Sequence, residues 1–171
     1  MSPSKPAANA WIALGSNLGD RAAQLAAALK DLPGEGARVC AVSSLYATAP
    51  VGLPGAPEFL NAVAAVRTEL GPEDLLAACH RLEARRGRIR TGALASRPLD
   101  LDLLLYGDLR RADPRLTLPH PRLTERAFVL QPLAEIAPDL LIAGETAAAW
   151  AIRVGSAGVR RLEHVPGWPP G

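Results

Sequence analysis

Aromatic residues make up only 4% of this 171-residue sequence, and lysine occurs only twice, as Lys5 and Lys30, against seventeen arginines. The two cysteines, Cys40 and Cys79, are too few for a disulfide scaffold or a cysteine zinc site. No apolar run approaches the ~18 residues that span a bilayer, and residues 1–10 lack an apolar segment of signal-peptide length. These absences argue against a secreted disulfide-rich protein and against a membrane-spanning one, so we expect a cytoplasmic protein.

The rest of the composition is that of one folded domain. Hydrophobic residues account for 49% of the chain and charged residues for 21%, close to the globular average. A chain of this length suits a single domain. We expect a disordered tail over residues 1–9, one domain over residues 10–165 and a C-terminal tail over residues 166–171.

Arginine is concentrated in one part of the chain. Residues 81–126 hold eleven arginines and six acidic residues, a net charge of +5, whereas the remaining residues carry a net charge of −3. Such an excess is the expected footprint of an anionic partner, and the guanidinium fork suits phosphate oxygens. A coding bias toward arginine would give the same composition, so composition alone leaves both interpretations open.

Strand-like and helix-like patterns follow one another irregularly. Strands are predicted over residues 10–15, 37–46, 59–70, 98–106 and 160–165, and helices over residues 21–32, 72–86, 125–135 and 146–152. Asp20 is placed to cap the first helix, and Pro72 occupies the first position of the second. Cys40 lies in a β-prone segment and is expected in the core. This order predicts an α+β fold in which helices pack on a mostly antiparallel sheet.

The most specific local pattern is the pair Asp100 and Asp102 in the leucine-rich segment 98–106. Side chains alternate between the faces of a strand, so the leucines at 99, 101 and 103 face a core. The two carboxylates then project together from the other face, about 7 Å apart. Because such a pair repels itself unless cations neutralise it, and because Mg²⁺ is usually bound by one or two carboxylates with phosphate oxygens, the pair predicts a metal site. The alternative is an edge strand with two solvated acids.

Basic residues flank the aspartates in the sequence. Arg88 and Arg90 would share one face of an extended chain, Arg97 lies just upstream of the aspartates, and His120 lies between two prolines. The alternatives are a solvated basic loop and a structural histidine. Together with the aspartates, these residues indicate Mg²⁺-dependent phosphoryl transfer, since that reaction depends on positioning and on charge stabilisation around a polyphosphate.

The order of these segments resembles one known family. The segments are ALGSNLGDR (13–21), TAPVG (48–52), FLNAV (59–63), LEARRGRIR (82–90), RPLDLDLLLYGD (97–108) and LTLPHPRLTERAFVLQPLAEIAP (116–138). In this order they are similar to the 6-hydroxymethyl-7,8-dihydropterin pyrophosphokinases of folate biosynthesis. The resemblance covers roughly residues 10–165, and its most specific parts are the R-P-L-D-L-D and L-P-H-P-R-L segments.

The resemblance implies a fold and a reaction. The fold would be a ferredoxin-like α/β/α sandwich with helices on both faces of a mostly antiparallel sheet. The enzyme would transfer the β- and γ-phosphates of ATP as one group to the hydroxymethyl group of the pterin and release AMP. Two Mg²⁺ ions would lie on Asp100 and Asp102, and Arg88 and Arg97 would also be catalytic. The family further implies a monomer that acts on these small molecules and binds neither nucleic acid nor membrane.

Two sets of binding residues follow from the resemblance. The pterin site would use Thr48, Ala49, Pro50, Val51, Phe59, Asn61 and Phe128. The ATP site would use Glu83, Arg88, Arg90, Arg97, Arg115, Thr117, His120 and Arg126. This division is chemically reasonable, because a flat heterocycle stacks between aromatic rings and an amide both donates and accepts along its polar edge.

Two further functions stay open. An RNA-binding α+β module is favoured by the basic segment and disfavoured by the scarcity of aromatic residues. A Mg²⁺-dependent phosphatase or nuclease would keep the metal site but would not release AMP from ATP. The sequence also departs from the family at residues 91–96, TGALAS, where relatives commonly carry a tryptophan and another arginine.

Overall fold

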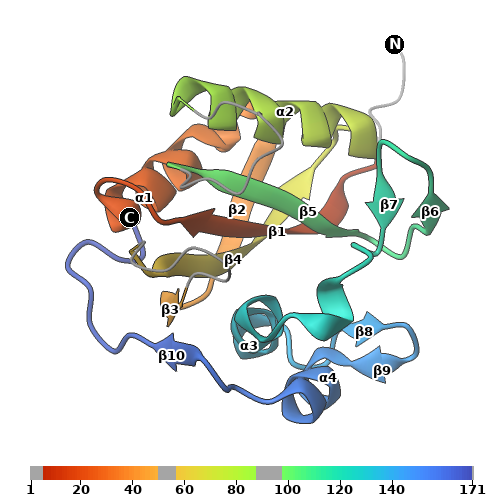
Figure 1. Cartoon of the computed structure of the whole chain (residues 1–171). Helices are drawn as coiled ribbons and strands as arrows, with labels where there is room; N and C mark the ends of the chain where they lie inside the picture. Colours follow the sequence, from red (N-terminus) through yellow and green to blue (C-terminus); the bar gives the residue numbers. More distant parts are fainter. Residues whose placement is uncertain (1–5, 50–56, 88–97, 171) are drawn as a thin grey trace.

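Six β-strands form an antiparallel sheet between two pairs of α-helices in the computed structural model, which describes residues 6–49, 57–87 and 98–170 (Figure 1). The helices are α1 (Arg21–Asp31), α2 (Pro72–Arg85), α3 (Ala127–Ile136) and α4 (Ala147–Val154). The sheet contains β1 (Ala8–Ser16), β2 (Ala37–Val42), β3 (Tyr46–Thr48), β4 (Phe59–Thr68), β5 (Asp100–Tyr106) and β10 (Val159–Arg161). Two short hairpins are formed by β6 (Arg111–Ala112) with β7 (Thr117–Leu118) and by β8 (Leu141–Ile142) with β9 (Glu145–Thr146).

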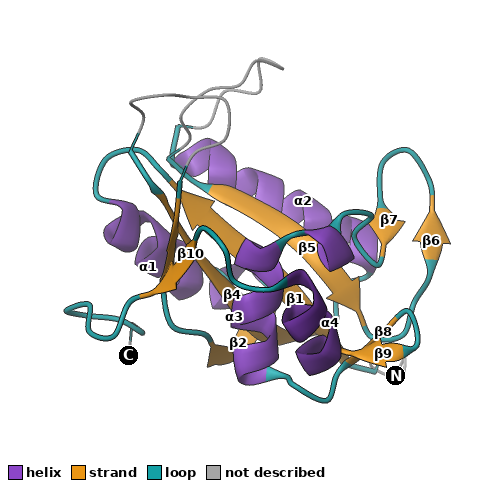
Figure 2. Ribbon diagram, turned by 60° about the horizontal axis from the view of Figure 1, so that its bottom comes forward, coloured by secondary structure: helices purple, strands orange, loops and turns teal. Residues whose placement is uncertain are grey.

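Each face of the sheet packs against one pair of helices. Alternate residues of β1, such as Ile12 and Leu14, join the core cluster that contains Leu25 of α1 and Leu75 of α2. Residues on the other face pack with α3 and α4, which lie together over the sheet in Figure 2. The predicted α+β sandwich with helices on both faces is therefore confirmed.

Local sequence signals begin the helices as expected. Asp20 accepts a hydrogen bond from the backbone N–H of Ala23 at 3.1 Å and so caps α1. Pro72 opens α2, and the acidic side chains of Glu73 and Asp74 follow in its first turn. Among the described residues, no helix has both the length and the apolar character that crossing a bilayer would require.

The strand order puts the two aspartates on the strand at one edge of the sheet. The strands follow the order β10-β3-β4-β1-β5, and β2 also pairs with β4. β1 pairs with β4 along its whole length and with β5 on its other side. Asp100 and Asp102 therefore lie on an edge strand, opposite Gly15 and Ala13 of β1.

A β-bulge makes the prediction for Cys40 wrong. β2 pairs Val39 with Val66 and Ala41 with Ala65 of β4, so Cys40 is the extra residue between two regular pairs. A bulge interrupts the alternation of side chains along a strand, and the Cys40 thiol is exposed rather than in the core.

Structured residues lie in both segments predicted as tails. Ala8 and Asn9 belong to β1 and pair with Thr68 and Arg67 of β4. Near the other end, Trp168 packs against the core cluster beneath α1 and α2. Its indole N–H donates to the carbonyl oxygen of Ser43 at 3.0 Å. The described fold therefore extends beyond residues 10–165 at both ends.

We expect Leu130→Ala to lower the free energy of unfolding by about 2–5 kcal/mol, because it leaves a cavity between α3 and the sheet. Leu130 is fully buried, whereas Ile152 of α4 is 82% exposed. The control Ile152→Ala should change the same quantity by less than ~0.5 kcal/mol. Urea denaturation followed by circular dichroism measures both, and equal losses would contradict the assigned core.

Candidate active site

Two cavities meet at Asp100 and Asp102. The larger cavity, about 660 Å³, extends over β1 and β4 to the start of α3 and the segment before β10. The smaller cavity, about 390 Å³, lies between β5, α2 and the segment from β7 to α3. Asp100, Asp102 and Arg126 line both cavities. A ligand in each cavity would therefore face the same two carboxylates and the same guanidinium group.

The register of three strands builds the floor of the larger cavity. Gly15 of β1 pairs with Asn61 of β4 on one side and with Asp100 of β5 on the other. Directly opposed residues of antiparallel strands place their side chains on the same face. Asn61 and Asp100 thus project together, and no side chain stands between them. A Cβ atom at position 15 would lie 3.2 Å from Asn61 Oδ1, so glycine keeps this floor open.

A buried amide and two aromatic residues line the larger cavity. Asn61 Nδ2 donates to Thr48 Oγ1 at 2.8 Å, and both residues are buried. This bond fixes the orientation of the amide, with its oxygen on the side of Gly15. Phe59 from β4 and Phe128 from the first turn of α3 also line the cavity. The combination suits a flat ligand with a polar edge.

Arg126 carries positive charge at the boundary between the two cavities. It immediately precedes α3, and its guanidinium carbon lies 5.6 Å from the centroid of the Phe128 ring. At this distance a cation–π attraction holds the guanidinium group over the ring. One residue pair therefore links an aromatic wall of the larger cavity to a cation beside the aspartates.

The β6–β7 hairpin brings polar residues to the smaller cavity. Asp113 accepts hydrogen bonds from the backbone N–H of Arg115 at 2.8 Å and from Arg111 Nη2 at 2.6 Å. Arg111 also donates to Glu73 of α2, and its hydrogen bonds lower the pKa of both Glu73 and Asp113. The hairpin is thereby attached to α2, with Arg115 and Thr117 on the cavity wall.

His120 is held in one orientation at the smaller cavity. Its backbone N–H donates to the carbonyl of Leu104 at 2.8 Å, and its Nδ1 accepts from the backbone N–H of Arg122 at 3.2 Å. Burial lowers its pKa, and the cations of Arg126 and Arg122 lower it further. Because Nδ1 is an acceptor, the neutral ring carries its proton on Nε2. The ring can therefore donate one hydrogen bond to an anionic ligand.

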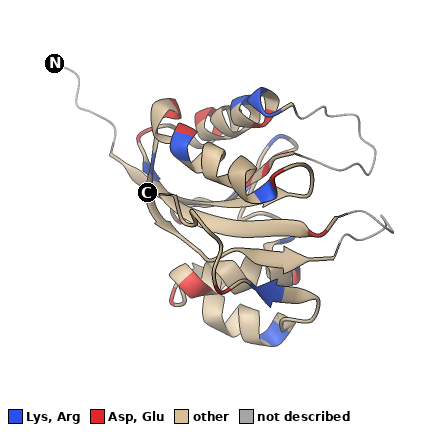
Figure 3. Ribbon diagram, turned by 90° about the vertical axis from the view of Figure 1, so that its left-hand side faces the viewer, with Lys and Arg blue, Asp and Glu red and all other residues tan. Residues whose placement is uncertain are grey.

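Charged residues are otherwise scarce on the strands that form the site. Figure 3 shows charge mainly on helices and strand ends, with most of the sheet uncharged. β1 has no charged residue, and β5 has only Asp100 and Asp102, which are half-buried. The described residues contain no group of three or more metal-ligating side chains. The aspartates fit Mg²⁺ because this ion commonly takes one or two carboxylates and completes its oxygen shell with substrate phosphates and water.

Glu83 supports the strand that carries the aspartates. Its side chain is buried at the α2–β5 boundary, with the residue only 1% exposed. Its Oε2 accepts from the backbone N–H of Leu101 at 2.9 Å, between Asp100 and Asp102. Glu83 is not among the residues that line the two cavities, and its predicted contact with ATP stays a prediction.

Comparison with known proteins identifies the family of this chain. The sequence model of the family described as 7,8-dihydro-6-hydroxymethylpterin-pyrophosphokinase (HPPK) matches residues 11–138. The chain belongs to the HPPK family. It is 46% identical over 155 residues to the 2-amino-4-hydroxy-6-hydroxymethyldihydropteridine pyrophosphokinase of Methylorubrum extorquens, covering 90% of this chain and 98% of that protein. A protein of the same name from Pseudomonas aeruginosa is 47% identical over 133 residues, covering 76% of this chain and 81% of the relative.

Solved structures of HPPK domains share the fold. An HPPK-DHPS chain of Plasmodium falciparum crystallised with pteroate superposes with a TM-score of 0.72 at 14% identity, over 94% of this chain and 47% of that one. Another HPPK-DHPS chain in complex with substrates gives a TM-score of 0.73 at 11% identity, with the same coverage. This chain therefore spans about half the length of those structures, and the likeness concerns the fold.

The structure brings together many of the residues that the HPPK resemblance implies. Those predicted for the pterin and described by the structure lie in the larger cavity, namely Thr48, Ala49, Phe59, Asn61 and Phe128. Those predicted for ATP and found in the smaller cavity are Arg115, Thr117, His120 and Arg126. Five predicted site residues fall outside the described residues, namely Pro50, Val51, Arg88, Arg90 and Arg97.

Several residues on the cavity walls were not predicted from the sequence. His80 and Leu76 of α2 line the smaller cavity. Ala157, Gly158 and Val159 line the larger cavity from the C-terminal part of the chain. The one available signal was for His80, which lies on a predicted helix immediately before the arginine-rich segment. The C-terminal residues reach the site only through the pairing of β10 with β3, which no local pattern indicates.

We expect Arg126→Gln to raise the pKa of His120, because it removes one of the cations that disfavour the protonated ring. In the wild type, burial and the two arginines should hold this pKa below the ordinary histidine value of about 6.5. NMR titration of the ring protons measures the shift. The control Arg38→Gln, on exposed β2, should leave the pKa unchanged; an unaltered His120 titration in Arg126→Gln would contradict the described geometry.

Proposed function

We propose that this chain transfers a pyrophosphoryl group from ATP to 6-hydroxymethyl-7,8-dihydropterin, releasing AMP, as an enzyme of folate biosynthesis. The observation that supports this most strongly is the pair of cavities that share Asp100, Asp102 and Arg126. A transfer reaction needs two substrates whose reacting atoms meet at one point. Membership of the HPPK family supplies the identity of the two substrates and disfavours the RNA-binding and phosphatase alternatives.

The larger cavity is the proposed site of the pterin. Phe59 and Phe128 offer aromatic surface for the flat ring. Asn61, fixed by Thr48, offers hydrogen-bonding groups for the polar edge of the ring. Since Asp100 lies on the same face beyond Gly15, a pterin bound in this way can direct its hydroxymethyl group toward the aspartates.

The smaller cavity is the proposed site of the nucleotide phosphates. Arg115 and Arg126 contribute cations, and Thr117 contributes a hydroxyl group. The neutral His120 ring would donate from Nε2 to a phosphate oxygen. Charge-assisted contacts of this kind are among the strongest that side chains make with phosphates. By the family resemblance, Arg88, Arg90 and Arg97 would add further positive charge.

Asp100 and Asp102 are the proposed ligands of two Mg²⁺ ions. Bound Mg²⁺ would supply Lewis-acid stabilisation of the negative charge on the phosphate oxygens. The chain fixes the two carboxylates through the pairing of β5 with β1 and through the bond from Leu101 N–H to Glu83. Arg126, which lines both cavities together with the aspartates, would add positive charge at the same point.

The proposed reaction forms one bond and breaks one bond at the β-phosphorus. The hydroxymethyl oxygen of the pterin bonds to the β-phosphorus of ATP, and the bond from that phosphorus to the oxygen bridging the α-phosphate breaks. AMP leaves with the bridging oxygen, and the hydroxyl proton passes to water. The residues of the site act by orienting the two groups in line and by stabilising charge, which is where most catalysis of phosphoryl transfer originates.

The proposal includes where and in what form the protein acts. We expect a cytoplasmic monomer that works on its two small-molecule substrates without nucleic acid or membrane. Support comes from the Methylorubrum extorquens relative, which this chain matches over 98% of that protein's length and which carries the name of this single activity.

Product analysis tests the proposed function. Purified protein is incubated with ATP, Mg²⁺ and 6-hydroxymethyl-7,8-dihydropterin, and the nucleotides and pterins are separated by chromatography. We expect AMP and the pterin diphosphate to appear in equal amounts. ADP together with a pterin monophosphate would indicate an ordinary kinase, and inorganic phosphate without pterin modification would indicate a phosphatase.

We expect Asp102→Asn to reduce kcat by roughly 100-fold or more, because it removes a charged metal ligand from the point where the substrates meet. The steady-state rate of AMP formation measures the loss, and the melting temperature checks folding. The control Asp108→Asn replaces an exposed acid in the turn after β5 and should retain wild-type turnover. Near-normal turnover by Asp102→Asn in Mg²⁺ would refute the metal assignment.

A further inference from the structure

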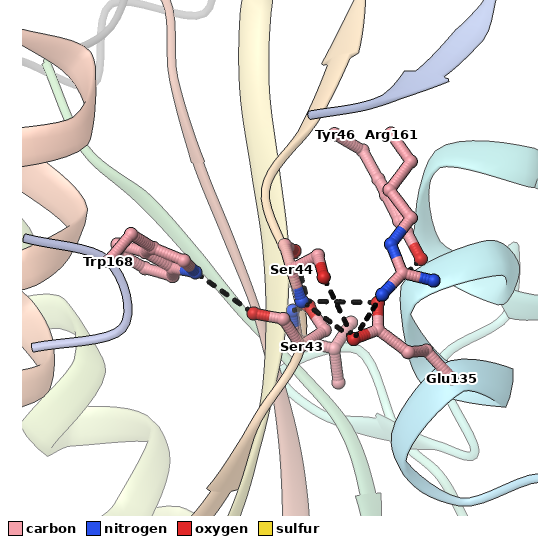
Figure 4. A network of polar contacts seen from close by, with 7 residues as sticks. Ser43, Ser44, Tyr46, Glu135, Arg161 and Trp168 are labelled. Carbon is pink, nitrogen blue, oxygen red and sulfur yellow. Dashed lines mark hydrogen bonds and ion pairs between the residues drawn. The ribbon is translucent and has the colours of Figure 1, made fainter. Parts of the chain in front are cut away.

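One carboxylate outside the cavities joins three segments of the chain that are far apart in the sequence. Glu135 of α3 accepts from the Tyr46 hydroxyl at 2.6 Å through Oε1 and from the Ser44 hydroxyl at 3.0 Å through Oε2. The backbone N–H of Ser44 lies 3.1 and 3.0 Å from the two oxygens. Arg161 of β10 completes the cluster, with Nη2 3.7 Å from Oε2 (Figure 4).

Each of these segments also forms a wall of the larger cavity. Tyr46 begins β3, and Thr48 at the end of the same strand holds Asn61. Glu135 lies two helical turns beyond Phe128 on α3. Arg161 pairs with Tyr46, and two residues away on the same strands Val159 pairs with Thr48. The three short elements that Glu135 connects thus also carry residues of the cavity wall, so a displacement at Glu135 would displace those residues.

The contacts of Glu135 are of a kind that fixes geometry. Its side chain is only 21% exposed, and Tyr46 is only 4% exposed. Burial and the hydrogen bond to Glu135 raise the pKa of Tyr46, so the phenol keeps its proton and donates. Hydrogen bonds to an ionised acceptor are short and directional, and a partly buried carboxylate with several donors permits little movement of the elements that supply them.

We propose that Glu135 is a positioning residue for the acceptor substrate. By holding α3, β3 and β10 together, it sets the separation between Phe128 and the Thr48–Asn61 pair, and so sets the affinity of the larger cavity for the pterin. It acts through these elements and touches neither substrate. The inference rests on the proposed function of the larger cavity as the pterin site.

Steady-state kinetics with each substrate varied separately test this role. We expect Glu135→Ala to raise KM for the pterin about tenfold, because small displacements of binding groups weaken productive binding, while KM for ATP changes less than about twofold. Glu135→Gln keeps the length of the side chain and one acceptor oxygen, and should recover much of the pterin affinity. Tyr46→Phe, which removes one donor without changing charge, should raise the same KM by about threefold.

Two control variants separate positioning from general stability. Leu29→Ala truncates a buried residue of α1 and should lower the melting temperature while leaving both KM values unchanged. Glu145→Ala removes an exposed ion pair with Arg153 and should leave the melting temperature and both KM values near wild type. If Glu135→Ala does not fold, Glu135→Gln and Tyr46→Phe decide the question by the same measurement.

The outcomes distinguish this inference from the proposed function. A selective rise in KM for the pterin in Glu135→Ala and Tyr46→Phe supports the positioning role. The positioning role is overturned, and the proposed function stays intact, if the wild-type protein forms AMP but KM for the pterin is unchanged in Tyr46→Phe and in every folded Glu135 variant. Absence of AMP formation by the wild-type protein overturns the proposed function itself, and the positioning role with it.

Discussion

The repulsion between two carboxylates on one face of β5 is the constraint around which the rest of the site is organised. Asp100 and Asp102 are placed together by the alternation of a single strand, so the pair is intrinsically unfavourable until cations approach it. The fold holds this arrangement from two sides. β1 pairs with the strand along one edge, and Glu83 accepts the backbone N–H of Leu101 between the two aspartates. Arg126 then brings a compensating charge to the point where both cavities open.

In the proposed function, each of the two substrates has its own cavity, and the two cavities differ in chemistry. Beyond the shared Asp100, Asp102 and Arg126, the larger cavity has two aromatic rings and a buried amide together with Arg122 and Glu125, whereas the smaller cavity has Arg115, a hydroxyl group and a neutral histidine. Gly15 contributes by the absence of a side chain, because it leaves open the space between Asn61 and Asp100. In this account Glu135 has a supporting role, as the common attachment of the elements that carry the acceptor side of the site.

Local rules predicted the parts of this structure that depend on neighbours in the sequence. Period-two alternation gave the shared face of Asp100 and Asp102, and capping preferences gave the starts of α1 and α2. The exposed thiol of Cys40 depends on a bulge, which a β-prone segment does not reveal. The contacts of Glu135 with Ser44, 91 residues away, and of Trp168 with Ser43, 125 residues away, exist only once the chain has folded. The division of the site residues into two cavities likewise depends on the sheet order.

We propose that the acceptor and the phosphates occupy different cavities and meet at Asp100 and Asp102. A crystal structure of the ternary complex with 6-hydroxymethyl-7,8-dihydropterin, a non-hydrolysable ATP analogue and Mn²⁺ in place of Mg²⁺ tests this most directly. We expect the pterin beside Asn61 and Phe128, the phosphates beside Arg115 and His120, and anomalous signal from Mn²⁺ at the two aspartates. Anomalous signal away from Asp100 and Asp102, or both substrates in one cavity, would contradict it.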